Sequence, residues 1–143
     1  MNWKEEAAQR LGDYRYMRNA QGSIHREIKR LEKEAAALKS LNLDVVCTPN
    51  APGRKEDRLL NNLVRRQQLE DSLEQVELWI DATDTALDCL KAEERQVLDR
   101  IYIHGDWGSA TELAADLGLE RSSLYRRRDD ALRKFTVALY GKS

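Results

Sequence analysis

The sequence predicts an all-α protein in which a long, coiled-coil-like antiparallel helical hairpin is followed by a smaller helix-turn-helix domain. Two long stretches carry apolar residues at alternating spacings of three and four, the repeat with which one helix buries a narrow seam against another. Both prolines of the chain fall between these stretches, in the segment CTPNAPG at residues 47–53, and such a segment marks a loop. The C-terminal part carries shorter amphipathic patterns that are separated by glycines.

The hairpin is predicted to occupy residues 1–89, with its loop at about residues 44–55. The seam of its first helix comprises Tyr14, Met17, Ile24, Ile28, Leu31, Ala35 and Leu38. The seam of its second helix comprises Leu69, Leu73, Val76, Ile80, Thr83, Leu87 and Leu90. Because two helices bury little core of their own, we expect the hairpin to pack against the C-terminal domain or against a second copy of the chain. A monomeric bundle of three or more helices is the alternative.

Residues 90–143 are predicted to form the helix-turn-helix domain. The apolar face of its first helix comprises Leu90, Val97, Leu98, Ile101 and Tyr102. The next helix is expected to start near Ser109 or Thr111, since both residue types are favourable N-caps. Glu112 stands three residues after Ser109, which is the spacing of a capping box.

The turn of this domain is predicted from Ala114, Gly118 and Leu124, which stand four and then six residues apart. The alanine is small where the following helix crosses, and the glycine permits a left-handed backbone at the turn. The leucine anchors the second helix against the first. Together with the amphipathic helix before it and the basic helix after it, this trio is typical of a helix-turn-helix.

The helix after the turn begins with RSSLYRRR, residues 121–128, which contains four arginines and no acid. In a helix-turn-helix, the N-terminal part of this helix enters the DNA major groove. With Leu124 facing inward, helical geometry sends four candidate base contacts outward: Arg121, Ser122, Tyr125 and Arg126. The candidate contacts to the DNA backbone are Ser123, Arg127, Arg128 and Arg133.

Charge is unevenly distributed along the chain, whose formal net charge is −1. Seven basic and three acidic residues give residues 119–143 a charge of +4, and the rest of the chain carries −5. This distribution favours contact between the C-terminal helix and a phosphate backbone. The alternative is a solvated helix face on which Asp129 and Asp130 pair with arginines one turn earlier.

We expect no enzymatic activity, no metal and no cofactor, because the sequence has no glycine-rich phosphate loop and no metal-ligand spacing, Cys47 and Cys89 included. The beginning MNWKEEAAQR lacks the apolar stretch of a secretory signal. No apolar run approaches the roughly 20 residues that span a bilayer. These features lead us to expect a cytoplasmic protein.

The segments LKAEERQVLDRIYIHG and TELAADLGLERSSLYRRRDDALRKF together resemble region four of bacterial sigma factors, which reads the promoter −35 element. Carried over residue by residue, the base-reading positions of that family fall on Arg121, Ser122, Tyr125 and Arg126. Ser122 and Tyr125 depart from the charged residues common in primary sigma factors, so the resemblance does not imply the −35 consensus as the target. The chain has no counterpart of sigma region two.

The whole chain resembles the ArpU/RinA family of phage late transcription regulators in its long helix beginning near YRYMRN, its proline loop, its second long helix and its end ALRKFTVALYG. The resemblance implies a sequence-specific transcription regulator of phages or prophages in the bacterial cytoplasm. It implies activation of late packaging, structural and lysis genes. The implied partners are promoter duplex DNA and the host RNA polymerase, and residues 14–90 are expected to mediate a homodimer.

Two other functions fit parts of the pattern. A small terminase subunit also combines a helix-turn-helix with long helices, recognises phage DNA for packaging and assembles into a ring. A structural coiled-coil adaptor would use the basic helix to bind protein. A ring-sized oligomer at a packaging site distinguishes the first alternative, and the absence of salt-sensitive duplex binding distinguishes the second.

Overall fold

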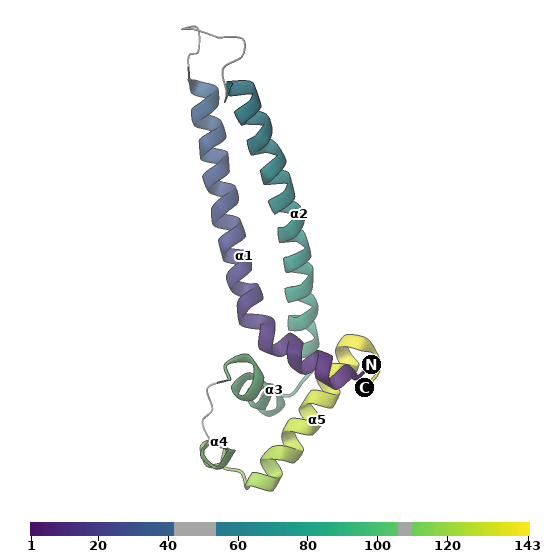
Figure 1. The fold of residues 1–143 in the computed structure, drawn as a ribbon. Helices are drawn as coiled ribbons and strands as arrows, with labels where there is room; N and C mark the ends of the chain where they lie inside the picture. The colour runs from purple at the N-terminus through teal and green to yellow at the C-terminus, as the bar shows by residue number, and fades with distance from the viewer. Residues whose placement is uncertain (42–53, 106–109) are drawn as a thin grey trace. The chain divides into compact units, whose positions relative to one another are not determined.

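The computed structural model describes residues 1–41, 54–105 and 110–143, which form five α-helices and one π-helical turn. Two long helices, α1 (Trp3–Ser40) and α2 (Lys55–Asp88), pack antiparallel (Figure 1). The C-terminal elements are α3 (Ala92–Leu98), the π-helical turn η1 (Asp99–Ile103), α4 (Ala110–Asp116) and α5 (Arg121–Tyr140). The predicted all-α hairpin followed by smaller helices is confirmed. Within the described ranges, no helix has both the length and the apolar composition needed to cross a membrane.

Some of the predicted features fall outside the described residues. They are the proline-containing segment at residues 47–53, most of the predicted loop, Cys47 and the N-cap candidate Ser109. The other N-cap candidate, Thr111, lies inside α4, which begins at Ala110.

The chain divides into two compact units, one formed by residues 1–18 with 78–143 and the other by residues 19–77. The base of the hairpin therefore belongs to the same unit as the C-terminal helices. The functional boundary that the sequence places near residue 90 stays a prediction.

The first unit is held together by an apolar cluster that we call the base core. Its buried members are Ala7, Leu11, Ala86, Leu87, Leu98, Ile103, Ala131, Leu132 and Phe135. Leu11 and Phe135 are both 0% exposed. The hairpin base thus packs against the C-terminal helices, which is one of the two arrangements expected from the sequence.

The seam of α1 is longer than the sequence pattern predicted. The predicted seam residues Ile28, Leu31, Ala35 and Leu38 are buried, and Tyr14, Met17 and Ile24 are partly buried. Ala7 and Leu11 are also buried, although they precede the predicted start at Tyr14. They were missed because the base core includes residues of α3, η1 and α5, which a repeat within one helix does not reveal.

Polar contacts fix the pairing of α1 with α2 in the first unit. Arg10 donates from Nε to Oγ1 of Thr83 at 2.7 Å and from Nη2 to the carbonyl of Trp79 at 3.0 Å. Its guanidinium also lies 4.5 Å from the centre of the Trp79 ring system. Tyr14 donates to Oδ1 of Asp84 at 2.6 Å, and burial together with this carboxylate raises the pKa of the tyrosine. Thr83, a polar residue in the predicted apolar seam, thus accepts from Arg10 and donates to the carbonyl of Trp79 at 2.8 Å.

The two ends of the chain meet in this unit. The rings of Trp3 and Tyr140 lie 5.0 Å apart between centroids, and Nζ of Lys142 lies 4.7 Å from the Trp3 ring centroid. The N and C labels of Figure 1 mark these neighbouring ends. Aromatic and cation–π contacts of this kind hold the start of α1 beside the end of α5.

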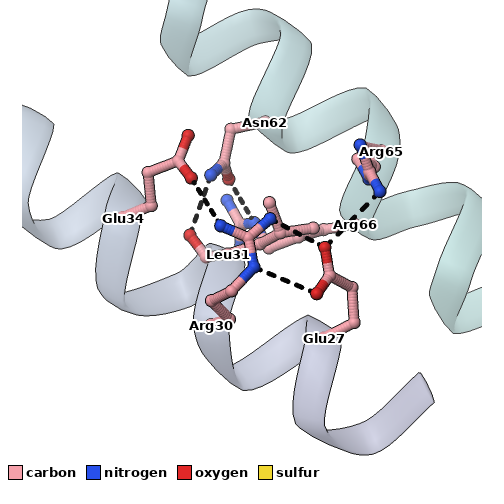
Figure 2. Close-up of polar contacts among 7 residues, drawn as sticks. All are labelled: Glu27, Arg30, Leu31, Glu34, Asn62, Arg65 and Arg66. Carbon is pink, nitrogen blue, oxygen red and sulfur yellow. Dashed lines mark hydrogen bonds and ion pairs between the residues drawn. The ribbon is translucent and has the colours of Figure 1, made fainter. Parts of the chain in front are cut away.

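The second unit contains a polar position inside the hairpin seam (Figure 2). Asn62 is 3% exposed; its side chain donates to the carbonyl of Leu31 at 2.8 Å and accepts from Nε of Arg66 at 2.7 Å. A slip of the helices would take the Leu31 carbonyl away from this buried amide and leave its N–H donors without an acceptor, so Asn62 favours one register. Near it, Glu27 lies 2.7 Å from Arg30 and 3.5 Å from Arg65 on the facing helix.

The π-helical turn changes which residues of the first C-terminal helix face inward. His104 donates its backbone amide to the carbonyl of Asp99 at 2.9 Å, a bond spanning five residues. The wider turn brings Ile103 into the base core, while the predicted Ile101 and Tyr102 are only partly buried. An α-helical period does not place Ile103 on the inward face, because the π-helical turn begins only at Asp99.

Replacing Leu11 with alanine tests the base core. Leu11→Ala should lower the free energy of unfolding by about 2–5 kcal/mol, since a buried leucine leaves a cavity when truncated. Urea unfolding followed by circular dichroism measures the change. Tyr16→Ala is the control, because Tyr16 is 74% exposed on the same helix and should change stability by less than about 0.5 kcal/mol. Equal stabilities of the two variants would contradict the placement of Leu11.

Candidate nucleic-acid interface

Helices α4 and α5 and the four residues between them form the predicted helix-turn-helix. A second apolar cluster, the turn core, holds them and comprises Val97, Ala110, Leu113, Ala114 and Leu124. Leu124 is 1% exposed and Ala114 is 4% exposed. The alanine and the leucine of the predicted trio are therefore both inward-facing, as their spacing indicated.

The turn itself is a Schellman motif at the end of α4. Gly118 has a φ of +68°, which is the left-handed conformation that glycine adopts without strain. The backbone amide of Leu119 donates to Ala114 at 2.8 Å, and that of Gly118 donates to Ala115 at 3.1 Å. These are the two bonds of the motif. Glu120 is extended and α5 begins at Arg121, so the turn determines where the basic segment starts.

The predicted DNA contacts lie on the first turns of α5 with unequal exposure. The predicted base contacts that are exposed are Arg121, Ser122 and Arg126. Tyr125 is partly buried because it packs against the turn core. Of the predicted backbone contacts, Arg133 is exposed, and the partly buried ones are Ser123, Arg127 and Arg128.

Tyr125 lies between two arginines of its own helix. The guanidinium of Arg128 is 5.0 Å from the ring centroid and that of Arg121 is 5.8 Å away. Arg121 also donates to the tyrosine hydroxyl at 3.5 Å, and Arg128 pairs with Asp129 at 3.0 Å. The carboxylate of Asp129 thus offsets an adjacent arginine and not one a turn earlier. Elsewhere in the described chain, no carboxylate forms an ion pair with Arg121, Arg126 or Arg127.

A hollow of about 330 Å³ lies between the beginning of α3 and residues 123–134 of α5, and we call it the α3–α5 hollow. Its lining residues are Lys91, Glu93, Glu94, Ser123, Arg126, Arg127, Asp130 and Lys134. It brings together three predicted contacts, Ser123, Arg126 and Arg127, and it adds two cations that were not among the predicted contacts, Lys91 and Lys134. Lys134 shares a helix face with Ser123 and Arg127, and this periodicity could have identified it. No local sequence signal identifies Lys91. It lies far from α5 in the sequence, and only the tertiary fold brings the two together.

Glu94 links the two walls of the hollow. Its Oε2 accepts from Nζ of Lys134 at 2.6 Å, and its Oε1 accepts from the backbone amide of Lys91 at 3.1 Å. The hydrogen bond from Lys134 lowers the pKa of this carboxyl most strongly, and the Lys91 amide lowers it further, against the opposing effect of burial. Glu94 and Lys134 therefore form a charged pair that caps α3 and joins it to α5.

Comparison of the chain with protein-family models, curated proteins and solved structures finds no match. The resemblances to sigma region four and to the ArpU/RinA family therefore stay predictions from the sequence. In the part of the chain that the structure describes, no group of three or more His, Cys, Asp or Glu side chains is placed to hold a metal ion.

The Glu94–Lys134 pair predicts a specific dependence of stability on pH. Because folding lowers the pKa of Glu94, its contribution is complete above the ordinary glutamate value of 4.5. The contribution is lost as the pH falls through the lower folded-state pKa. Thermal unfolding between pH 7 and pH 3 should show a smaller loss of stability for Glu94→Gln than for the wild type. Lys134→Gln removes the hydrogen bond that lowers the pKa of Glu94 most strongly, so it should also reduce the loss of stability on acidification. A Glu94→Gln variant that loses as much stability as the wild type would contradict this role.

Proposed function

We propose that the C-terminal part of this chain binds double-stranded DNA, with the first turns of α5 in the major groove. The observation that carries the proposal is the set of exposed side chains Arg121, Ser122 and Arg126 on a helix that begins directly after a Schellman turn. The turn core fixes that helix against α4. A helix held in this way presents its N-terminal residues to base edges.

The chemistry of each side chain determines whether we assign it to base edges or to phosphates. Arg121 and Arg126 are the proposed guanine readers, since a guanidinium can donate two hydrogen bonds to one guanine edge. Ser122 and Tyr125 complete the base-reading set. The cations Arg127, Arg128 and Arg133 are proposed to meet phosphates together with Ser123. Because Arg128 already pairs with Asp129, we expect it to contribute less than Arg127.

The proposed biological role is transcription regulation at a phage or prophage late promoter, together with the host RNA polymerase. The sigma-like segment at residues 90–141 and the whole-chain resemblance to the ArpU/RinA family support this role. The hairpin is the proposed surface for a second copy of the chain or for polymerase.

The first test is selection of bound duplexes from a random pool, with the particle mass measured by light scattering on the same sample. A short enriched motif bound by a monomer or dimer supports the regulator. A ring-sized particle that enriches no short motif supports the small terminase alternative. The absence of duplex binding at low salt overturns both DNA-binding functions and leaves the structural coiled-coil adaptor as the remaining alternative.

Two paired substitutions separate base reading from backbone contact. Arg121→Ala with Arg126→Ala should remove sequence preference, at a cost of about 1–3 kcal/mol of discrimination for each arginine. Arg127→Ala with Arg128→Ala should weaken binding to all duplexes and reduce its salt dependence. Fluorescence anisotropy with the selected motif and a scrambled duplex measures both effects.

The matched control is Lys4→Ala with Lys142→Ala, which also removes two exposed positive charges, here from positions outside residues 14–90 and outside the proposed DNA contacts. It should leave both duplex affinities close to those of the wild type. If the Arg121→Ala, Arg126→Ala protein still selected the same motif, the proposed reading face would be wrong.

A further inference from the structure

We propose that the α3–α5 hollow is a binding site for a phosphate of the DNA backbone, and that Lys91 is a DNA contact supplied from outside the helix-turn-helix. This inference rests on the proposed duplex binding and extends it. It adds a second element to the interface, because Lys91 directly precedes α3 whereas the other proposed contacts are all on α5.

The charges in the hollow are not equally available. Glu94 and Lys134 neutralise each other at 2.6 Å, and Glu94 is also held by the Lys91 backbone amide. The remaining cations of the lining are Lys91, Arg126 and Arg127. In the described part of the chain, none of these three side chains forms an ion pair.

The remaining acids of the hollow are Glu93 and Asp130, and both are exposed. Water and salt screen their repulsion of an approaching anion, and the same screening acts on the attraction from the exposed cations Lys91 and Arg126. Because Arg126 is a proposed guanine reader, Lys91 and Arg127 are the cations left to hold the phosphate. The charge of Arg126 still adds to the local field, so the three cations of the lining exceed the two carboxylates by one. The hydroxyl of Ser123, on the same wall as Arg127, adds a neutral donor.

The position of the hollow on α5 matches where a phosphate must lie. Ser123, Arg127 and Lys134 recur on one flank of the helix, and Arg121 with Tyr125 lies on the other. A helix inserted into a groove about 12 Å wide has a sugar–phosphate strand close to each flank. If the exposed face of α5 reads bases, the flank that carries the hollow is directed towards one of these strands.

The size of the hollow is also suitable. Sites for small ligands occupy about 300–1,000 Å³, and this hollow has about 330 Å³. A phosphodiester group with some of its hydration water fits such a volume. The hollow lies between two elements joined by the Glu94–Lys134 pair, so its walls are fixed before DNA arrives.

Lys91→Gln is the decisive substitution. Its folding risk is low because Glu94 accepts from the Lys91 backbone amide, which the substitution keeps, and the Lys91 side chain is exposed. We expect a several-fold loss of affinity for every duplex, an unchanged sequence preference and a salt slope reduced by about one. Lys4→Gln removes the same charge from an exposed site on α1 that lies outside residues 14–90, and it is the control.

A scan with duplexes that carry one neutral methylphosphonate at successive positions locates the contact. At one phosphate, neutralisation should weaken binding of the wild type and of Lys4→Gln by a larger factor than it weakens binding of Lys91→Gln, which keeps only the Arg127 and Ser123 contacts to that phosphate. That coupling identifies the bound phosphate. Equal losses in all three proteins at every position, or a Lys91→Gln salt slope equal to that of the control, overturns the site while leaving the proposed function intact. No duplex binding by the wild type overturns the proposed function, and this inference with it.

Discussion

The burial of Phe135 and Leu11 in the base core is the constraint on which the arrangement of the C-terminal helices depends. Phe135 lies in the second half of α5, and Leu11 belongs to the first helix of the hairpin. The first half of the same helix is fixed separately, by Leu124 in the turn core. Because α5 is anchored at two points along its length, its basic first turns are held rigidly without being buried. A recognition surface needs this combination of fixed backbone and accessible side chains.

Electrostatics divides the basic segment into parts with different partners. Arg128 is occupied by Asp129 and by the ring of Tyr125, whereas Arg126 and Arg127 face the α3–α5 hollow. The one tightly held cation of the hollow, Lys134, serves to fix Glu94. Similar residues on one helix therefore differ in how freely they can meet an anion, and that difference arises from the neighbouring elements and not from the residue type.

The features that depend on the spacing of residues close together in the sequence could be predicted from the sequence alone. The spacing of three and four predicted the hairpin, and the trio of Ala114, Gly118 and Leu124 predicted the buried and left-handed positions of the turn. Features that depend on long-range contacts were not predictable. Asn62 is a polar residue whose partner is a carbonyl on the other helix, and Lys91 reaches α5 only through the tertiary fold. Ile103 was missed because a π-helical turn shifts the inward face by one residue.

The contact between the two chain ends has a practical consequence for work on this protein. Trp3 and Tyr140 touch at the end of α5 that is opposite its basic turns. The 20 residues of α5 extend about 30 Å at 1.5 Å per residue. A fluorophore or affinity handle on either terminus would therefore be separated from Arg121 by the length of a whole helix. A circular permutant with a short linker between residues 1 and 143 would join two segments that already lie side by side.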